Sequence, residues 1–103
     1  MTDYAPIPLE FQMAEEAGRG TLTAMSGDRR AGVLAFSRLS DATLLVEHVQ
    51  TFPGFQGQGV GQRIVEEGIA WARANAHKLL PLCPFARTIF DRHPEYADVR
   101  HGL

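Results

Sequence analysis

The 103-residue sequence has only one cysteine, so it cannot form an internal disulfide, and a reducing cytoplasm is the expected compartment. It lacks an apolar run long enough to span a membrane. Residues 1–8 contain neither a basic segment nor an apolar core, so we predict no signal peptide. The formal net charge is -2, which leaves no basic footprint for nucleic acid.

The remaining composition is that of an ordinary globular domain, with 45% hydrophobic and 21% charged residues. We expect residues 1–10, which contain Pro6 and Pro8, to form an extended arm, and residues 11–103 to form a single domain. No metal site is predicted, because four candidate ligands lack the spacing of a metal-binding set: His48, His77, Cys83 and His93.

Four glycines fall within residues 53–61, between an apolar run at 42–52 that predicts a strand and an amphipathic run at 60–76 that predicts a helix. Glycine lets a backbone approach an anion closely, and the first N–H groups of a helix point toward it. No Lys-Ser or Lys-Thr follows the last glycine, which excludes a P-loop, and the spacing does not fit a dinucleotide fingerprint. The stretch therefore predicts a phosphate cradle made of Gln56, Gly57, Gln58, Gly59, Val60 and Gly61; a tight structural turn is the alternative.

The rest of the pattern predicts an α/β (α+β) fold, with a mainly antiparallel sheet of about four strands and two flanking helices. Strands at 20–25, 31–39 and 42–52 form an antiparallel meander, and residues 11–17 fit either a strand or a helical turn. A fourth strand at 78–82 follows a helix, so it pairs in parallel with the third by a right-handed crossover. A short helix at 86–92 and a turn at 93–98 complete the chain.

The third strand is apolar on both alternations, which predicts that both of its faces are covered. Alternation puts His48 and Gln50 on one face and Glu47 and Val49 on the other, unless a bulge intervenes. In the following helix, Gly68 is unfavourable relative to alanine, and we expect close packing of the helix on the sheet to explain it.

Three motifs together resemble a known family. Gln56, Gly59 and Gly61 fit the pattern Gln/Arg-x-x-Gly-x-Gly/Ala of an acetyl-CoA pyrophosphate loop. His48 and Pro53 precede it much as in a His-Thr-Glu-Val-Pro segment, with the proline one place later. Further on lie the blocks Pro-Leu-Cys-Pro-Phe (81–85) and Arg-His-Pro-Glu-Tyr (92–96). Over residues 11–99 the chain resembles the small YjdJ-type group of GNAT-superfamily N-acetyltransferases.

The resemblance implies a minimal GNAT-like fold that uses acetyl-CoA as co-substrate, bound where the third and fourth strands splay apart. Backbone N–H groups of residues 56–61 would hold the pyrophosphate, and the cofactor site would also include Val49, Pro84 and Phe85. Pro81 and Pro84 agree with this independently, because a strand short of N–H donors leaves a gap in which a pantetheine arm can pair.

The implied activity is acetyl-CoA-dependent N-acetyl transfer to an amine of a protein, peptide or polyamine. The alternative is a non-catalytic CoA-binding or acyl-CoA-binding module, or a protein-interaction module, because Gln50 stands where the group usually has glutamate and an amide accepts no proton at neutral pH.

His48 or Glu47 could act as the base instead. Cys83 is a candidate nucleophile, a residue lining the thioester pocket, or a small buried hydrophobe. Arg87 and Arg92 could reach a CoA phosphate, and a monomer or homodimer is expected.

Overall fold

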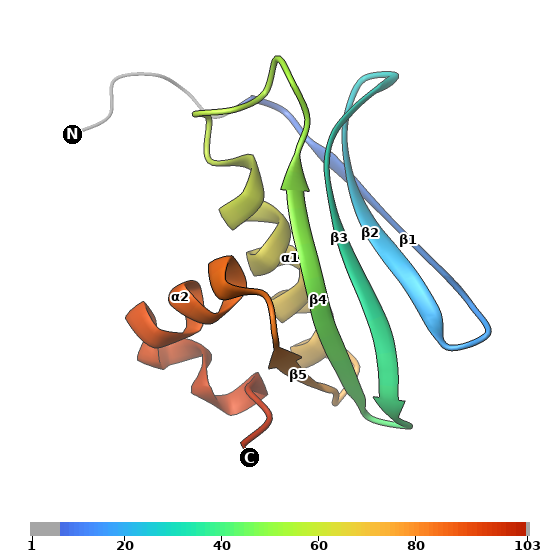
Figure 1. The fold of residues 1–103 in the computed structure, drawn as a ribbon, viewed down its shortest axis with the longest axis vertical. Coiled ribbons are helices and arrows are strands. Elements are labelled where there is room, and N and C mark those ends of the chain that lie inside the picture. The colour runs from blue at the N-terminus through green and yellow to red at the C-terminus, as the bar shows by residue number, and fades with distance from the viewer. Residues whose placement is uncertain (1–6, 103) are drawn as a thin grey trace.

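The computed structural model describes residues 7–102, which form one five-stranded sheet with helices on one side (Figure 1). The elements are β1 (Glu10–Glu16), β2 (Arg19–Ser26), β3 (Arg29–Ser40), β4 (Thr43–Thr51), α1 (Val60–Ala74), β5 (Lys78–Pro81), α2 (Pro84–Arg92) and the 3-10 helix η1 (Pro94–Val99). The strands lie in the order β1-β2-β3-β4-β5. The first four are antiparallel and β5 is parallel to β4, so the predicted meander and crossover pair are confirmed.

The sheet has one strand more than the four predicted, because residues 10–16 form β1 rather than a helical turn. Phe11 and Met13 alternate with polar residues, pair with Ala24 and Leu22 of β2, and pack against the core. The turn predicted at 93–98 is instead the 3-10 helix η1. Of the predicted arm, residues 1–6 lie outside the described residues, residues 7–9 form no helix or strand, and β1 begins at residue 10.

The core lies between the sheet and α1, which runs behind the sheet in Figure 1. Phe36 of β3 and Val46 of β4 are buried against Ile64 and Ile69 of α1. Three residues of β4 are exposed on the other side: Glu47, His48 and Gln50. The prediction that both faces of this strand are covered is therefore wrong, because no helix among residues 7–102 packs on that face. We call it the helix-free face. Within the described residues, no helix is both long and apolar enough to cross a membrane.

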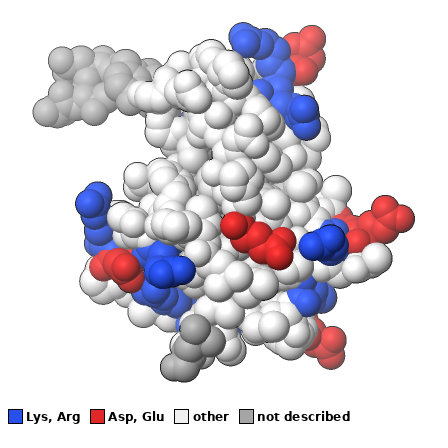
Figure 2. All heavy atoms as spheres, viewed as in Figure 1, with Lys and Arg blue, Asp and Glu red and all other residues white. Residues whose placement is uncertain are grey.

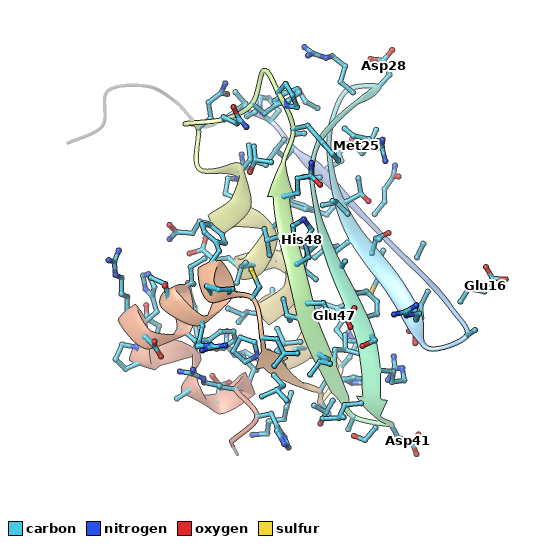
Figure 3. The ribbon with its side chains drawn as sticks, viewed as in Figure 1. Glu16, Met25, Asp28, Asp41, Glu47 and His48 are labelled. Atoms are coloured by element: carbon cyan, nitrogen blue, oxygen red, sulfur yellow. The ribbon has the colours of Figure 1, made fainter. Side chains whose placement is uncertain are left out.

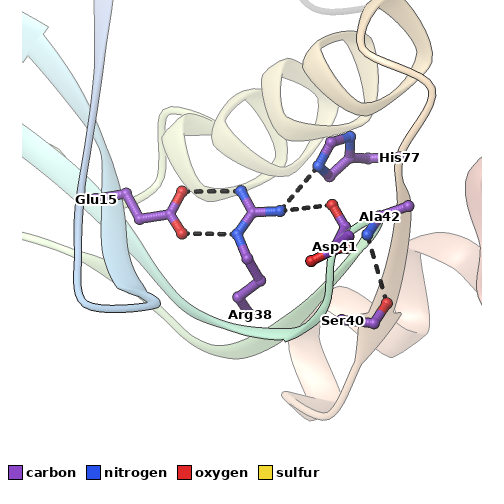
Figure 4. Close-up of polar contacts among 6 residues, drawn as sticks. All are labelled: Glu15, Arg38, Ser40, Asp41, Ala42 and His77. Atoms are coloured by element: carbon purple, nitrogen blue, oxygen red, sulfur yellow. Dashed lines mark hydrogen bonds and ion pairs between the residues drawn. The ribbon is translucent and has the colours of Figure 1, made fainter.

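Arg38 ties together the lower ends of β1 and β3 and the connection from α1 to β5 (Figure 4). Its Nε and Nη2 atoms donate to Glu15 at 2.7 and 2.9 Å, and Nη1 donates to the Asp41 carbonyl at 2.9 Å. These hydrogen bonds, together with the charge of Arg38, lower the pKa of the Glu15 carboxyl. His77 Nε2 lies 3.0 Å from Arg38 Nη1 and its Nδ1 lies 2.8 Å from the Asn75 carbonyl. Arginine only donates, so Nε2 of His77 is the acceptor in this contact.

Gly68 of α1 does face the sheet, but the packing there leaves room for a methyl group. A methyl group placed on its Cα would lie 3.7 to 4.0 Å from Leu22, Leu34 and Leu79, which is ordinary van der Waals contact. Because glycine inside a helix costs up to about 1 kcal/mol relative to alanine, we expect Gly68→Ala to stabilise the fold by up to about 1 kcal/mol in urea unfolding.

The same change at Gly32 of β3 has the opposite expected effect. Its added methyl group would lie 2.7 Å from the end of Ile64 and 2.8 Å from the Gln50 carbonyl oxygen, which is backbone and cannot move aside cheaply. Overpacking of this kind costs about 1–3 kcal/mol. Gly68→Ala serves as the matched control. Equal unfolding midpoints for the two variants would contradict this account of how α1 packs on the sheet.

Candidate acetyl-CoA site

The site begins where the parallel pairing of β4 and β5 stops. Pairing runs from Thr43 and Lys78 to Val46 and Pro81, and goes no further. The N–H groups of Leu82 and Cys83 both turn to the Val46 carbonyl, at 2.9 and 3.2 Å. Beyond Val46, β5 therefore offers β4 no ladder partner, and the two chains splay apart as the prolines at 81 and 84 predicted.

A β-bulge in β4 lies at this splay. Ala35 pairs with His48 but its neighbour Phe36 pairs with Val46, so Glu47 is the extra residue. Ser37, which faces away from the helices, donates from Oγ to Glu47 Oε2 at 3.1 Å. The bulge thus brings Glu47 and His48 to the same helix-free face, as strand alternation alone would not.

The bulge also decides which backbone groups face the splay. The Phe52 N–H donates to the Ala31 carbonyl, so this pair is bonded toward β3. Hydrogen-bonded pairs alternate along an antiparallel ladder, which leaves the N–H and C=O groups of Val49 and Thr51 pointing away from β3. These two residues therefore present free backbone donors and acceptors to the opening between β4 and β5. The Val49 side chain meanwhile packs against the core.

The loop between β4 and α1 depends on glycines at the positions that the sequence singled out. Gly54, Gly57 and Gly59 have φ values of +92°, +81° and +73°, which are left-handed conformations that other residues adopt only with strain. No atom lies within 4 Å of the position of an added Cβ on Gly57 or Gly59. The concave side of the loop is thus open where a side chain would otherwise fill it.

This loop ends at the N-terminus of α1, where the first backbone N–H groups of the helix lack an acceptor within the helix. The first helical bond runs from Arg63 N–H to the carbonyl of Gly59, the N-cap residue, at 3.1 Å. The N–H groups of residues 60–62 therefore have no partner within the helix. No acidic residue and no side-chain cap occupies this first turn. The arrangement favours an anion, by both hydrogen bonds and the helix dipole.

A pocket of about 280 Å³ lies at the loop and reaches Thr51, the last residue of β4. Phe85 forms its far wall, and a methyl group added to Gly61 would lie only 3.0 Å from the Phe85 ring. Gln58 donates from Nε2 to the Gly54 carbonyl at 3.3 Å, so its side chain braces the loop. Six of the nine residues predicted to bind the cofactor line it: Gln56, Gly57, Gly59, Val60, Gly61 and Phe85. Thr51, Phe55 and Gln62, which were not predicted, complete the lining, and Val49 and Gln58 are not part of it. Pro84 does not line it; it opens α2.

Two arginines that sequence reasoning did not single out pack behind the loop. The Arg29 guanidinium stacks on Phe55 with 4.7 Å to the ring centroid, and Arg30 stacks on Phe52 at 5.1 Å. Both are the first residues of β3, directly after the turn that joins it to β2. Cation–π contacts of this kind contribute about 0.5–1 kcal/mol when exposed. Two adjacent arginines at one strand start and two phenylalanines in the loop after β4 were the only signal in the sequence.

The predicted catalytic residues separate into two groups. His48 and Gln50 lie exposed on the helix-free face, two residues apart on β4, and Glu47 joins them there (Figure 3). Cys83 lies apart from them: it is the N-cap residue of α2, only 8% exposed, and belongs to the hydrophobic core. Among the described residues, no three potential ligands gather as a metal centre would require.

Solved structures similar to this fold include acetyltransferases. A GCN5-like protein from Staphylococcus aureus, solved by NMR, is 20% identical with a TM-score of 0.64, over 89% of each chain. A Bacillus subtilis acetyltransferase in complex with CoA is 15% identical with a TM-score of 0.64, over 87% of this chain and 76% of that one. A GNAT family acetyltransferase from Elizabethkingia anophelis with acetyl-CoA bound is 15% identical with a TM-score of 0.59, over 75% of this chain and 53% of that one.

The fold is thus that of an acetyltransferase. The sequence profile of the GCN5-related N-acetyl-transferase family matches residues 21–99, and the chain belongs to that family. The YjdJ-type subgroup remains a resemblance of motifs. No curated protein matches the chain.

Proposed function

We propose that this protein transfers the acetyl group of acetyl-CoA to the amine of an acceptor. The observation that carries the proposal is the open glycine loop at the start of α1, whose pocket reaches Thr51 at the edge of the β4–β5 splay. An extended pantetheine arm matches the splay, because it can pair with a strand edge as a peptide does. The family and the acetyl-CoA or CoA bound in two structural relatives support the same ligand.

In this proposal the diphosphate of CoA lies in the loop formed by residues 56–61. The backbone N–H groups there and at the start of α1 would donate to its oxygens, and the left-handed glycines leave the space for it. The loop itself carries no basic side chain between residues 52 and 62, so binding would rest on backbone donors and the helix dipole rather than on ion pairs.

The chemistry that follows needs one proton acceptor on the helix-free face. The acceptor nitrogen forms a bond to the thioester carbonyl carbon, the carbon–sulfur bond breaks, and CoA leaves as the thiolate. We assign the amine proton to His48, and the attraction of the incoming ammonium group to Glu47, which no basic side chain among residues 7–102 pairs with. A positioned base contributes about a hundred- to ten-thousand-fold.

Cys83 has no part in this scheme. Its side chain is only 8% exposed and packs in the apolar core, which keeps the sulfur away from an incoming thioester. Intact-mass spectrometry after incubation with acetyl-CoA should therefore show no acetyl group that is lost in Cys83→Ala.

Gln50 favours a second candidate, a module that binds CoA or acyl-CoA without turning it over. Its exposed side chain lies two residues beyond His48 on the same face. For an enzyme we expect Gln50→Glu, measured by thiol release from acetyl-CoA with and without amines, to raise the rate, because it adds a proton acceptor beside the acceptor amine. If neither the variant nor the wild type releases thiol faster than the spontaneous background, the result would favour the binding module.

A further inference from the structure

A second pocket, of about 530 Å³, is nearly twice as large as the one at the glycine loop. Its walls come from β5, α2, η1 and the C-terminal residues that follow η1, where Arg100 bridges to Leu79 and the His101 N–H donates to the Leu79 carbonyl at 2.8 Å. The residues that line it are Leu80, Pro81, Leu82, Arg87, Ala97, Arg100, His101 and Gly102.

The register of the sheet places one wall of this pocket, the Leu80 side chain, on the helix-free face that also carries Glu47. Ser37, which donates to Glu47, pairs across the sheet with Leu45, so both face away from the helices. Leu45 in turn pairs with Leu80 of β5, and paired residues of neighbouring strands share a face. Leu80, in the lining of the pocket, is thus one strand spacing from β4, or about 4.8 Å.

The charge of the pocket is basic. Arg87, Arg100 and His101 line it, and none of its lining residues within 7–102 is acidic. Arg87 Nη2 donates to the Leu82 carbonyl at 3.0 Å, which holds its guanidinium against the pocket, and none of the ion pairs among residues 7–102 involves it. Arg100 is partly balanced by Asp91 at 2.8 Å. In Figure 2, which has the view of Figure 1, a red group stands over β4 and blue groups lie toward α2.

We propose that this pocket binds an anionic group, a carboxylate or a phosphate, that belongs to the acceptor amine. The inference rests on the proposed function, because the amino group of the same molecule would lie at Glu47 and His48. The apolar side chains of Leu80 and Leu82 would contact the carbon chain between the two groups. Leu80 lies about 4.8 Å across from Leu45, and Glu47 lies two residues, or about 7 Å, further along β4, so that chain spans roughly 8 Å or more. The acceptor is thus a short amine with an anionic end rather than a polyamine.

Matched amines test the proposal by turnover. Thiol release is measured with acetyl-CoA and β-alanine, 4-aminobutyrate or 6-aminohexanoate, each against the alkylamine of the same length, with 3-aminopropyl phosphate as the phosphate arm. We expect kcat/KM at least about tenfold higher for amines with an anionic end, which corresponds to one hydrogen-bonded charge pair at about 1.4 kcal/mol. A higher rate with 3-aminopropyl phosphate than with the amino acids assigns the pocket to phosphate, and a lower rate assigns it to carboxylate. Equal rates for the anionic amines and their matched alkylamines overturn the proposal.

Arg87→Gln should remove this preference, while Arg92→Gln, on the same helix but outside the pocket lining, should keep it. Both variants should bind CoA as the wild type does. A weaker CoA affinity in Arg87→Gln alone would assign Arg87 to a CoA phosphate and overturn the proposal.

Amide chemical shifts give a readout that does not depend on turnover. The protein is first saturated with CoA and then titrated with 6-aminohexanoate or with hexylamine. The expected result is a shift of the Leu82, Ala97 and Gly102 amides with the amino acid only, which is lost in Arg87→Gln. Failure of CoA to bind overturns the proposed function itself, whereas CoA binding without these shifts overturns the pocket assignment alone.

Discussion

Gly59→Glu is expected to weaken acetyl-CoA binding by about a hundredfold or more while leaving the protein folded. Gly59 has φ of +73° at the N-cap of α1, where a residue with a Cβ costs about 1–2 kcal/mol. The new carboxylate would also point into the open side of the loop and repel the diphosphate. The backbone strain lowers stability and not affinity, so the hundredfold loss, about 2.8 kcal/mol, comes from this repulsion and from the space that the side chain takes. Calorimetric titration with acetyl-CoA measures it.

The matched control is Gly27→Glu. Gly27 lies in the turn between β2 and β3 with φ of +63°, and no atom lies within 4 Å of its added Cβ either. Both variants therefore bear a similar backbone strain and the same added charge, but only one lies in the loop. Equal affinities for acetyl-CoA in the two variants would show that the glycine loop is a structural turn.

His48→Gln is expected to lower kcat by about a hundred- to ten-thousand-fold, the contribution of a positioned base. Its exposed side chain lies on the helix-free face, whereas the glycine loop and the first turn of α1 lie on the other side of β4. The dissociation constant of acetyl-CoA should thus remain unchanged. Steady-state thiol release and calorimetry on the same preparation separate the two quantities.

Two other carboxylates serve as comparisons for this variant, Glu47 beside His48 and Glu16 three strands away. Glu47→Gln is expected to raise KM for the amine more than it lowers kcat, because we assign this carboxylate to attraction of the ammonium group. Glu16→Gln, an exposed acid at the end of β1, should change neither quantity. A large loss of kcat in Glu47→Gln with His48→Gln unaffected would make the bulge carboxylate the base and contradict the assignment to His48.

Much of the fold could be predicted because local patterns agree with it. The switch from alternating apolar residues to a helical period, with glycines between, defined β4, the loop and the first residue of α1 correctly. The missing N–H groups of Pro81 and Pro84 were enough to predict that β4 and β5 splay apart. β1 stayed ambiguous because Ala14, Glu15 and Glu16 are good helix formers, and only pairing with β2 decides in favour of a strand.

The site could be predicted only in part. Which residues of β4 lie on each face depends on features that do not show in the pattern of residue types along the sequence. The bulge at Glu47 interrupts the register without changing the alternation of residue types, so Glu47 was expected opposite His48. The exposure of that face depends on where the helices pack. The apolar residues Leu45 and Val49 instead led to the prediction that both faces of β4 are covered. The basic pocket brings together residues 80–102 from four separate segments, which no local spacing could reveal.

The central claim is that the splay and the glycine loop hold acetyl-CoA, and direct calorimetry on the wild-type protein tests it most simply. The account predicts saturable binding of both acetyl-CoA and CoA, and no comparable binding of ATP, which has phosphates but no pantetheine arm to pair with β4. Absence of binding at millimolar acetyl-CoA, or equal binding of ATP, would contradict it.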